Sequence, residues 1–164
     1  MTIALFIGRF QPLHNGHAAI IKEIASKCDV IKIGIGSAQL SHTKDNPLSA
    51  EERTKMLKLF LHEAQITNVK IYLIPDINND TLWVQHVMNI VGSFDVVYSG
   101  NPLVIRLFQK KKIMVKRIDE IHPYKATRTR TAVRQSRQIT QDVPPIVLKY
   151  LERIDALERI KKCG

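Results

Sequence analysis

The chain has 164 residues, of which 45% are hydrophobic, a size and composition typical of one ordinary globular domain. Its apolar runs have the length of strands, far below the roughly 20 residues that a membrane-spanning helix needs. The formal charge of +10 predicts a surface that attracts polyanions, and nucleotides, nucleic acid and acidic membranes all fit that description.

The first half of the chain alternates between strand and helix patterns. Apolar runs predict strands at residues 3–8 and 30–36. Residues 14–27, between them, have the spacing of an amphipathic helix, with Asn15 as its candidate N-cap. Residues 37–49 are polar and rich in turn-forming residues, which predicts a long loop.

The pattern continues after this loop. Ser49 and Glu52 have the spacing of a capping box, so a helix is expected from there to about residue 64. A third strand is expected at residues 69–75, and Asp80 is the candidate cap of the following helix. A fourth strand is expected at residues 94–100, Pro102 suits the first turn of another helix, and residues 113–115 predict a short fifth strand.

The last part of the chain, from about residue 127 to 164, is predicted to be helical. A helical turn is expected at residues 131–137, and Pro144-Pro145 begins a last helix that reaches Ile154. The whole predicts a single domain over residues 1–164, with a Rossmann-like three-layer α/β/α fold and a five-stranded, mainly parallel sheet. Because ligands bind at the carboxyl ends of such strands, the residues at the four long strand ends should gather at one edge.

Residues 8–17, which follow the first strand, have the composition of a binding turn. Pro12 stiffens the turn, Gly16 permits close approach of a ligand, and His14 and His17 flank the first turn of the next helix. A helix N-terminus has unpaired N–H groups and a partial positive charge, which favours an anion. The residues alone leave four interpretations open: a phosphate cradle, a metal site, a nucleic-acid contact, or histidines that order a turn.

Several common signatures are missing from the chain. The segment GIGSAQ lacks the third glycine of a dinucleotide fingerprint, and no P-loop pattern occurs. Cys28 and Cys163 form neither a CxxC pair nor a zinc spacing. The first residues lack the charged region and cleavage site of a signal peptide, which predicts a cytoplasmic location. If phosphates bind, the turn at residues 8–17 is therefore expected to hold them.

These motifs carry a family resemblance. GRFQPLHNGH resembles the GxFxPxHxGH signature of the nucleotidyltransferase superfamily, and residues 129–134, TRTAVR, match its second signature, Ser/Thr-x-Thr-x-x-Arg. Within the superfamily, SAQLSHT, IPDINNDTLW and YSGNPLV are similar to the archaeal-type nicotinamide-nucleotide adenylyltransferases. The resemblance covers nearly the whole chain.

The resemblance implies a reaction and a set of residues. The reaction is transfer of AMP from ATP to nicotinamide mononucleotide (NMN), giving NAD⁺ and pyrophosphate, with Mg²⁺ bound to ATP and no metal held by the protein alone. The matching catalytic positions are His14, His17 and Arg134. The expected ATP and phosphate contacts are Gly8, Arg9, Phe10, Gly16, Gly100, Asn101, Arg106, Thr129 and Thr131, and the expected NMN contacts are Ser37, Gln39, Asp76, Ile77 and Trp83.

The chain departs from the family in its second signature. The family usually has Ser-Gly-Thr-Glu-Val/Ile-Arg-Arg-Arg, whereas here Thr129, Arg130 and Ala132 replace Ser, Gly and Glu, and Gln135 and Ser136 replace two arginines. Arg128 and Arg130 are candidates to supply the missing charge.

Two alternatives remain. The chain could use another phosphate acceptor within the superfamily, or it could be a basic nucleic-acid-binding domain, although it has no helix-turn-helix, RNA-recognition or zinc pattern. The resemblance implies ATP and NMN as partners and a homo-oligomer, and it leaves open the choice between nicotinamide and nicotinic acid mononucleotide.

Overall fold

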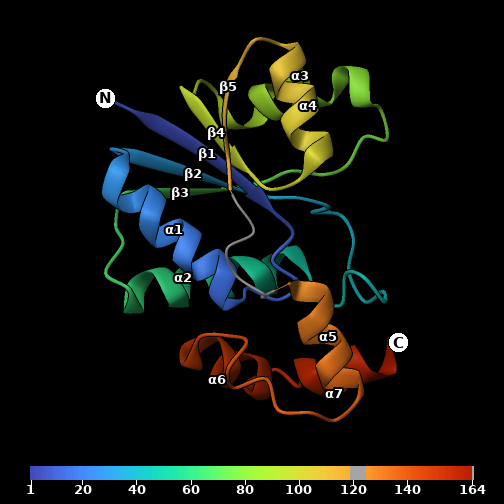
Figure 1. Ribbon diagram of the computed structural model, residues 1–164. Helices are drawn as coiled ribbons and strands as arrows, with labels where there is room; N and C mark the ends of the chain where they lie inside the picture. The colour runs from blue at the N-terminus through green and yellow to red at the C-terminus, as the bar shows by residue number, and fades with distance from the viewer. Residues whose placement is uncertain (119–124, 164) are drawn as a thin grey trace.

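The computed structural model describes residues 1–118 and 125–163, and its centre is a five-stranded parallel sheet (Figure 1). The strands are β1 (Ile3–Gly8), β2 (Val30–Ile35), β3 (Val69–Leu73), β4 (Val96–Ser99) and β5 (Met114–Arg117), in the order β3-β2-β1-β4-β5. Every neighbouring pair is parallel, so the predicted fold class is confirmed and the sheet is wholly rather than mainly parallel. The strand order reverses beside β1, which places the switch point between β1 and β4.

Helices cover both faces of the sheet, as Figure 1 shows. The helices are α1 (Asn15–Lys27), α2 (Ala50–Glu63), α3 (Asp80–Val91), α4 (Pro102–Lys110), α5 (Ala126–Arg134), α6 (Pro145–Arg153) and α7 (Ala156–Lys162). Helices α1 and α2 lie on one face, α3 and α4 on the other, and α5–α7 pack beyond α1 and α2. None of the helices in the described ranges is long and apolar enough to cross a bilayer.

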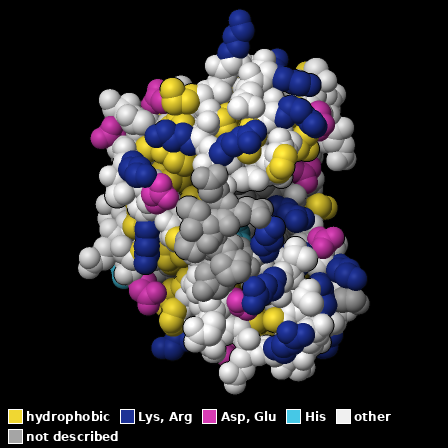
Figure 2. All heavy atoms as spheres, in the orientation of Figure 1, with side chains coloured by type: hydrophobic (Ala, Val, Ile, Leu, Met, Phe, Trp, Pro, Cys, Tyr) yellow, Lys and Arg dark blue, Asp and Glu magenta, His cyan; other side chains and the backbone are white. Residues whose placement is uncertain are grey.

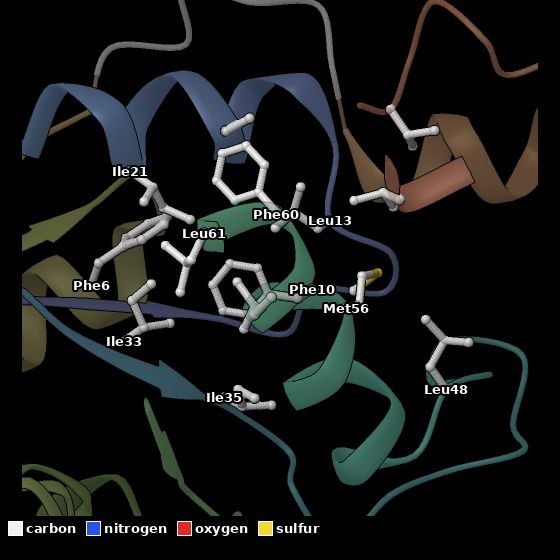
Figure 3. Packing of buried hydrophobic residues seen from close by; sticks show 14 of the residues in the cluster. Phe6, Phe10, Leu13, Ile21, Ile33, Ile35, Leu48, Met56, Phe60 and Leu61 are labelled. Carbon is white, nitrogen blue, oxygen red and sulfur yellow. The ribbon is translucent and has the colours of Figure 1, made fainter. Parts of the chain in front are cut away.

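Two hydrophobic clusters hold these layers together. Along β1, Ala4 and Phe6 face the α1–α2 layer, and Leu5 and Ile7 face the α3–α4 layer, because successive side chains of a strand alternate between faces. Figure 3 shows Phe6 among side chains from β2, α1 and α2. Each fully buried side chain of this size contributes roughly 1.5–3 kcal/mol to stability. The two clusters therefore fix the position of the strands, and with it the position of the residues at the strand ends.

Several element boundaries differ from the predictions. The cap of α1 is His14 rather than Asn15, because Asn15 uses its side-chain amide to donate to the carbonyl of Gln141. Asn79 rather than Asp80 caps α3, through bonds from two backbone N–H groups to its side-chain oxygen. The helix expected at residues 131–137 is α5, which begins at Ala126 and ends at Arg134.

The expected last helix is two helices. It breaks after Arg153, because Asp155 takes a left-handed conformation with φ of 53°, and α7 follows. Strand β3 begins at Val69 as predicted and ends at Leu73, two residues before the predicted end. Strand β4 runs from Val96 to Ser99, which is shorter than the predicted 94–100 at both ends. Strand β5 extends two residues past its predicted end. The capping box of Ser49 and Glu52 is confirmed.

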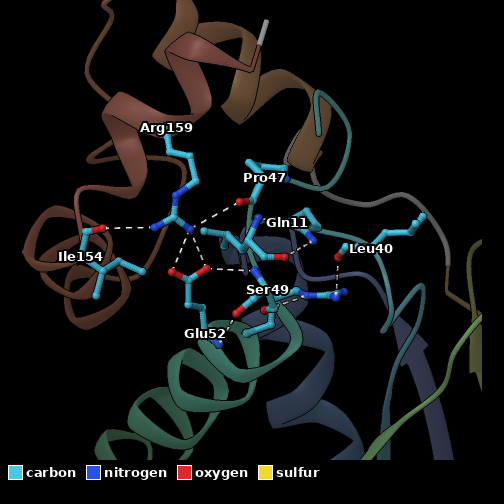
Figure 4. Close-up of polar contacts among 9 residues, drawn as sticks. Gln11, Leu40, Pro47, Ser49, Glu52, Ile154 and Arg159 are labelled. Carbon is cyan, nitrogen blue, oxygen red and sulfur yellow. Dashed lines mark hydrogen bonds and ion pairs between the residues drawn. The ribbon is translucent and has the colours of Figure 1, made fainter. Parts of the chain in front are cut away.

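An ion pair links the C-terminal helices to this capping box (Figure 4). Glu52 accepts the backbone N–H of Ser49, at 2.9 Å, and both of its carboxylate oxygens accept bonds from Nη1 of Arg159, at 2.7 and 2.8 Å. Burial tends to raise the pKa of Glu52, but the bonds from Arg159 and Ser49 outweigh it and lower the pKa below 4.5. The contact therefore joins α7 to the start of α2.

Replacing Glu52 tests this link. Glu52→Gln keeps an acceptor for Ser49 and removes the charge that faces Arg159, so we expect it to lower the free energy of unfolding by about 1 kcal/mol at neutral pH. Because the folded-state pKa of Glu52 is depressed, the advantage of the wild type is complete above the unfolded value and disappears as the pH falls through the folded value. Urea unfolding between neutral and acidic pH measures it.

Glu158→Gln is the matched control, since Glu158 pairs with Lys161 on the exposed side of α7. It should change stability little. A wild-type advantage over Glu52→Gln that is unchanged in acid would contradict the assignment.

Candidate active site

A cavity of about 830 Å³ lies where the carboxyl ends of the strands meet. Its lining includes eleven of the predicted site residues: Gly8, Arg9, His14, Gly16, His17, Ser37, Asp76, Ile77, Trp83, Gly100 and Asn101. Most come from the ends of β1, β2, β3 and β4 and the turns that follow, as the parallel topology requires, and Gly16, His17 and Trp83 come from the first turns of α1 and α3. Lys and Arg side chains are spread widely over the face shown in Figure 2, in keeping with the net charge.

His14 and His17 cap the first turn of α1 reciprocally. Nδ1 of His14 accepts the backbone N–H of His17 at 3.2 Å, and Nδ1 of His17 accepts the backbone N–H of His14 at 3.4 Å. The two rings stack with their centroids 3.7 Å apart. Because each Nδ1 acts as an acceptor, the hydrogen of each neutral ring is on Nε2, which remains available to donate to a ligand.

Both rings are held in the neutral form. Burial lowers the pKa of His14 from 6.5 to about 4. Burial also lowers the pKa of His17 well below its ordinary value, and the neighbouring His14 lowers it further. At neutral pH the start of α1 therefore presents two uncharged N–H donors beside the partial positive charge of a helix N-terminus.

Phe10 supports this pair from beneath. Its ring is buried, lies 4.8 Å from the ring of His17, and packs edge-on against Phe6. A Cβ atom on residue 8 would lie 3.0 Å from the Phe10 ring, a tight contact that the glycine avoids. Phe10 does not line the cavity, and its observed contacts position His17.

The side of the cavity near β3 contains Asp76, Ile77 and Trp83. Gln39 holds Asp76 by two bonds: its Nε2 donates to the carbonyl of Asp76 at 3.2 Å, and its Oε1 accepts the backbone N–H of Asp76 at 3.0 Å. Nε2 of His86 donates to the carbonyl of Pro75 at 2.9 Å. Through its two bonds Gln39 fixes the backbone of Asp76. Gln39 itself does not line the cavity.

The side of the cavity near β4 contains Gly100 and Asn101. Asn101 caps α4 by accepting the backbone N–H of Leu103 at 2.9 Å, and its own N–H bonds to the hydroxyl of Ser99 at 3.1 Å. The N-terminus of α4 therefore opens beside the cavity on this side. The cavity thus has two halves, one on each side of β1.

Four further predicted residues lie outside the lining. Arg106 is exposed on α4, and Thr131 is exposed on α5. Thr129 is buried, and its hydroxyl donates to the carbonyl of Lys125 within α5. Arg134 donates to the carbonyls of Lys44, at 2.6 Å, and Ile160, at 3.3 Å. Their predicted contacts with ATP are not visible in this arrangement and stay predictions.

Comparison with known proteins agrees with this geometry. A family model described as cytidylyltransferase-like matches residues 5–135. The chain belongs to the cytidylyltransferase-like family. Its nucleotidyltransferase relatives include the nicotinamide-nucleotide adenylyltransferases of Methanolobus tindarius and Thermoplasma acidophilum, each 41% identical to it. The matches cover 98% and 97% of this chain and 94% and 90% of those proteins, so the resemblance read from the motifs is confirmed.

Two solved structures share the fold. One is the bifunctional NMN adenylyltransferase/ADP ribose pyrophosphatase of Francisella tularensis, complexed with AMP and a Mn ion, with a TM-score of 0.80 and 22% identity. It is matched over 98% of this chain and 52% of its own, so the chain spans about half of that protein. The other is a putative nicotinate-nucleotide adenylyltransferase of Vibrio parahaemolyticus, with a TM-score of 0.71 and 19% identity, covering 97% of this chain and 96% of that one.

The cavity of the present chain also has lining residues that were not predicted from the sequence. Lys116 and Arg117 end β5 and enter the cavity, and Lys116 lies 5.5 Å from the ring centroid of Tyr98. The expected strand ends at residue 115, whereas β5 continues to Arg117 and so brings both side chains to the sheet edge. Lys125, at the start of α5, lines the cavity too.

The lining offers little to a metal ion on its own. Across residues 1–118 and 125–163, no three His, Cys, Asp or Glu side chains are grouped as metal ligands. The histidines use Nδ1 as an acceptor for backbone N–H groups, which removes that nitrogen from metal binding.

The tautomer of the histidine pair can be measured directly. Long-range ¹H–¹⁵N correlation NMR should show both rings neutral at about pH 7, with hydrogen on Nε2, and His14 should gain a proton near pH 4. Because the unfolded chain protonates these rings first, stability should fall as the pH drops below about 6.5. The urea-unfolded chain is the control, with all histidines titrating near 6.5. Hydrogen on Nδ1 in the native protein would contradict the reciprocal cap.

Proposed function

We propose that the chain is a nicotinamide-nucleotide adenylyltransferase that joins NMN and the AMP part of ATP to give NAD⁺ and pyrophosphate. The observation that carries the proposal is the pair of neutral Nε2–H donors at the start of α1, placed between the two halves of one cavity. The names of the relatives that cover nearly the whole chain support the same activity.

The chemistry asks little of the protein beyond position and charge. A phosphate oxygen of NMN attacks the α-phosphorus of ATP, a new P–O bond forms, and the bond to the pyrophosphate oxygen breaks. The attacking phosphate is already ionised, so the protein need not supply a nucleophile or remove a proton. Donors that face the developing negative charge lower the barrier, and they act best when they are fixed in advance.

The two halves of the cavity suit the two nucleotides. We assign NMN to the β3 side, where Trp83 can stack on the nicotinamide ring and Asp76 can accept a hydrogen bond from the carboxamide. We assign ATP to the β4 side, beside Gly100, Asn101 and the α4 N-terminus. The phosphates of both would then meet at His14 and His17.

Mg²⁺ would enter as part of the ATP complex, so it would belong to the substrate and would supply positive charge to the leaving phosphates. Arg9, which follows the end of β1, is one of the cations in the lining, and it is assigned to phosphate. Roles for Arg106, Thr129, Thr131 and Arg134 in holding the triphosphate stay predictions, as do a homo-oligomeric assembly and a cytoplasmic location.

The reaction is tested with pure protein, ATP, Mg²⁺ and one acceptor at a time. We expect NMN to give NAD⁺ and pyrophosphate in equal amounts, measured by liquid chromatography with mass detection. Parallel reactions contain nicotinic acid mononucleotide, FMN, or pantetheine phosphate. Product only with one of the last two would establish a different member of the family, and tighter binding to random DNA than to either nucleotide would favour the nucleic-acid alternative.

Two substitutions at His17 separate catalysis from capping. His17→Asn places an amide group where Nδ1 was and keeps the cap, whereas His17→Gln places its amide nitrogen near the position of Nε2. We expect His17→Asn to lower kcat about 10²–10³-fold with little loss of stability, since one transition-state donor is removed. His17→Gln should retain more activity and unfold more easily. The reverse order of kcat would contradict the assigned donor.

A further inference from the structure

Arg53 on α2 is a fully buried arginine that bonds only to backbone carbonyls among the described residues. Its Nε donates to Ser49 at 3.2 Å, Nη1 donates to Arg9 at 3.1 Å and to Gly36 at 2.8 Å, and Nη2 donates to Ser37 at 3.1 Å and to Leu40 at 3.4 Å. A guanidinium has five N–H donors, so these five carbonyls satisfy it completely. Among the described residues no carboxylate bonds to it, and burying a cation outside an ion pair is costly, which points to a purpose for its position.

The carbonyls that Arg53 holds belong to the cavity wall. Arg9, Gly36 and Ser37 line the cavity, although Arg53 does not. Arg9 follows the end of β1, and the other two follow the end of β2, so one side chain joins the ends of two adjacent strands from behind. Its bonds to the carbonyls of Leu40 and Ser49 also fix the loop after β2 and the N-terminus of α2.

Two of these wall turns are strained. Phe10 follows Arg9 and has φ of 51°, and Ser37 has φ of 48°, both in the left-handed region that residues other than glycine rarely adopt. Such conformations persist only where surrounding contacts determine them. Arg53 supplies such contacts, because it binds the carbonyl before Phe10 and the carbonyls before and after the Ser37 Cα.

The same bonds orient peptide dipoles. In a trans peptide the N–H points opposite to the C=O, so carbonyls turned toward Arg53 direct the N–H groups of Phe10 and Ser37 away from it. Burial, together with the nearby Arg9, lowers the pKa of Arg53 to about 10, so the group stays charged at neutral pH. A fixed positive charge therefore lies behind the turns that form the wall of the proposed anion site.

We propose that Arg53 is a positioning residue for nucleotide transfer, which holds the strained ends of β1 and β2 so that Arg9 and Ser37 meet the reacting phosphates in the correct geometry. This deepens the proposed function and rests on it. The role requires the five-donor fork and not merely a buried charge, because a lysine has three donors and cannot satisfy five carbonyls.

Lys32 on β2 provides a matched control. It too is a buried cation, and its Nζ donates to the backbone carbonyls of Val91 and Ser93, at 2.5 and 2.7 Å. It does not line the cavity, and its bonds hold the C-terminal end of α3. Lys32→Met therefore has the structural cost of losing a buried cation without any effect on the wall turns.

The experiment compares Arg53→Met, Arg53→Lys and Lys32→Met with the wild type, at a temperature where circular dichroism shows all four folded. We expect Arg53→Met to lower kcat about 10²-fold and Arg53→Lys to lower it about tenfold, since small displacements of positioning groups have such effects. Lys32→Met should keep kcat and both KM values within about twofold while losing stability. If Arg53→Met does not fold, Arg53→Lys carries the comparison.

A binding measurement separates this inference from the proposed reaction. Calorimetric titration with MgATP alone needs no turnover, and we expect its affinity for Arg53→Met to fall about tenfold relative to Lys32→Met. If the wild type makes no NAD⁺ but this difference is found, the proposed reaction fails and the positioning role stands. If the folded Arg53 variants match Lys32→Met in both kcat and MgATP affinity, the positioning role is wrong.

Discussion

A parallel sheet brings the carboxyl ends of its strands to one edge, and the backbone groups there no longer have ladder partners. Buried N–H and C=O groups must nevertheless be satisfied, and in this molecule long polar side chains satisfy them. Arg53 bonds to carbonyls after β1 and β2, Gln39 bonds to both backbone groups of Asp76, and Gln11 bonds to both backbone groups of Leu48. The edge that ends the strands is therefore also a fixed set of turns around a cavity.

The histidine pair follows the same rule with one difference. One nitrogen of each ring satisfies a backbone N–H at the start of α1, and the other nitrogen remains a donor. Structural and chemical roles are thus combined in one side chain, which fits the stacked, neutral state of both rings. A neutral ring donates a hydrogen bond without the desolvation cost of a buried imidazolium, so the site is ready before any nucleotide arrives.

The sequence predicted the layers of the fold well because period and capping are local signals. The apolar runs of β1 and β2 and the Ser49–Glu52 box depend on a few neighbouring residues. The α1 cap was missed because its partners are an imidazole pair rather than the usual small polar residues, and because the true contact of Asn15 lies across the fold at Gln141. Arg53 gave no signal either, since an arginine in an amphipathic helix ordinarily faces solvent.

In the second family signature, residues 129–134, the role of Arg130 depends on its tertiary contacts. Where the family usually has glycine, Arg130 is buried on α5, and it donates to the carbonyl of Gln11 at 3.0 Å and to the carboxylate of Asp45 at 3.3 Å. Burial lowers its pKa, and Arg9 lowers it further, so two cations lie near each other around the β1–α1 turn. The same turn that places the histidines is thus tied to α5 by a guanidinium that the family pattern does not contain. The charge of Arg130 therefore helps to join α5 to the turn at residues 8–17, and the N–H that bonds to the carbonyl of Gln11 is not available to a phosphate.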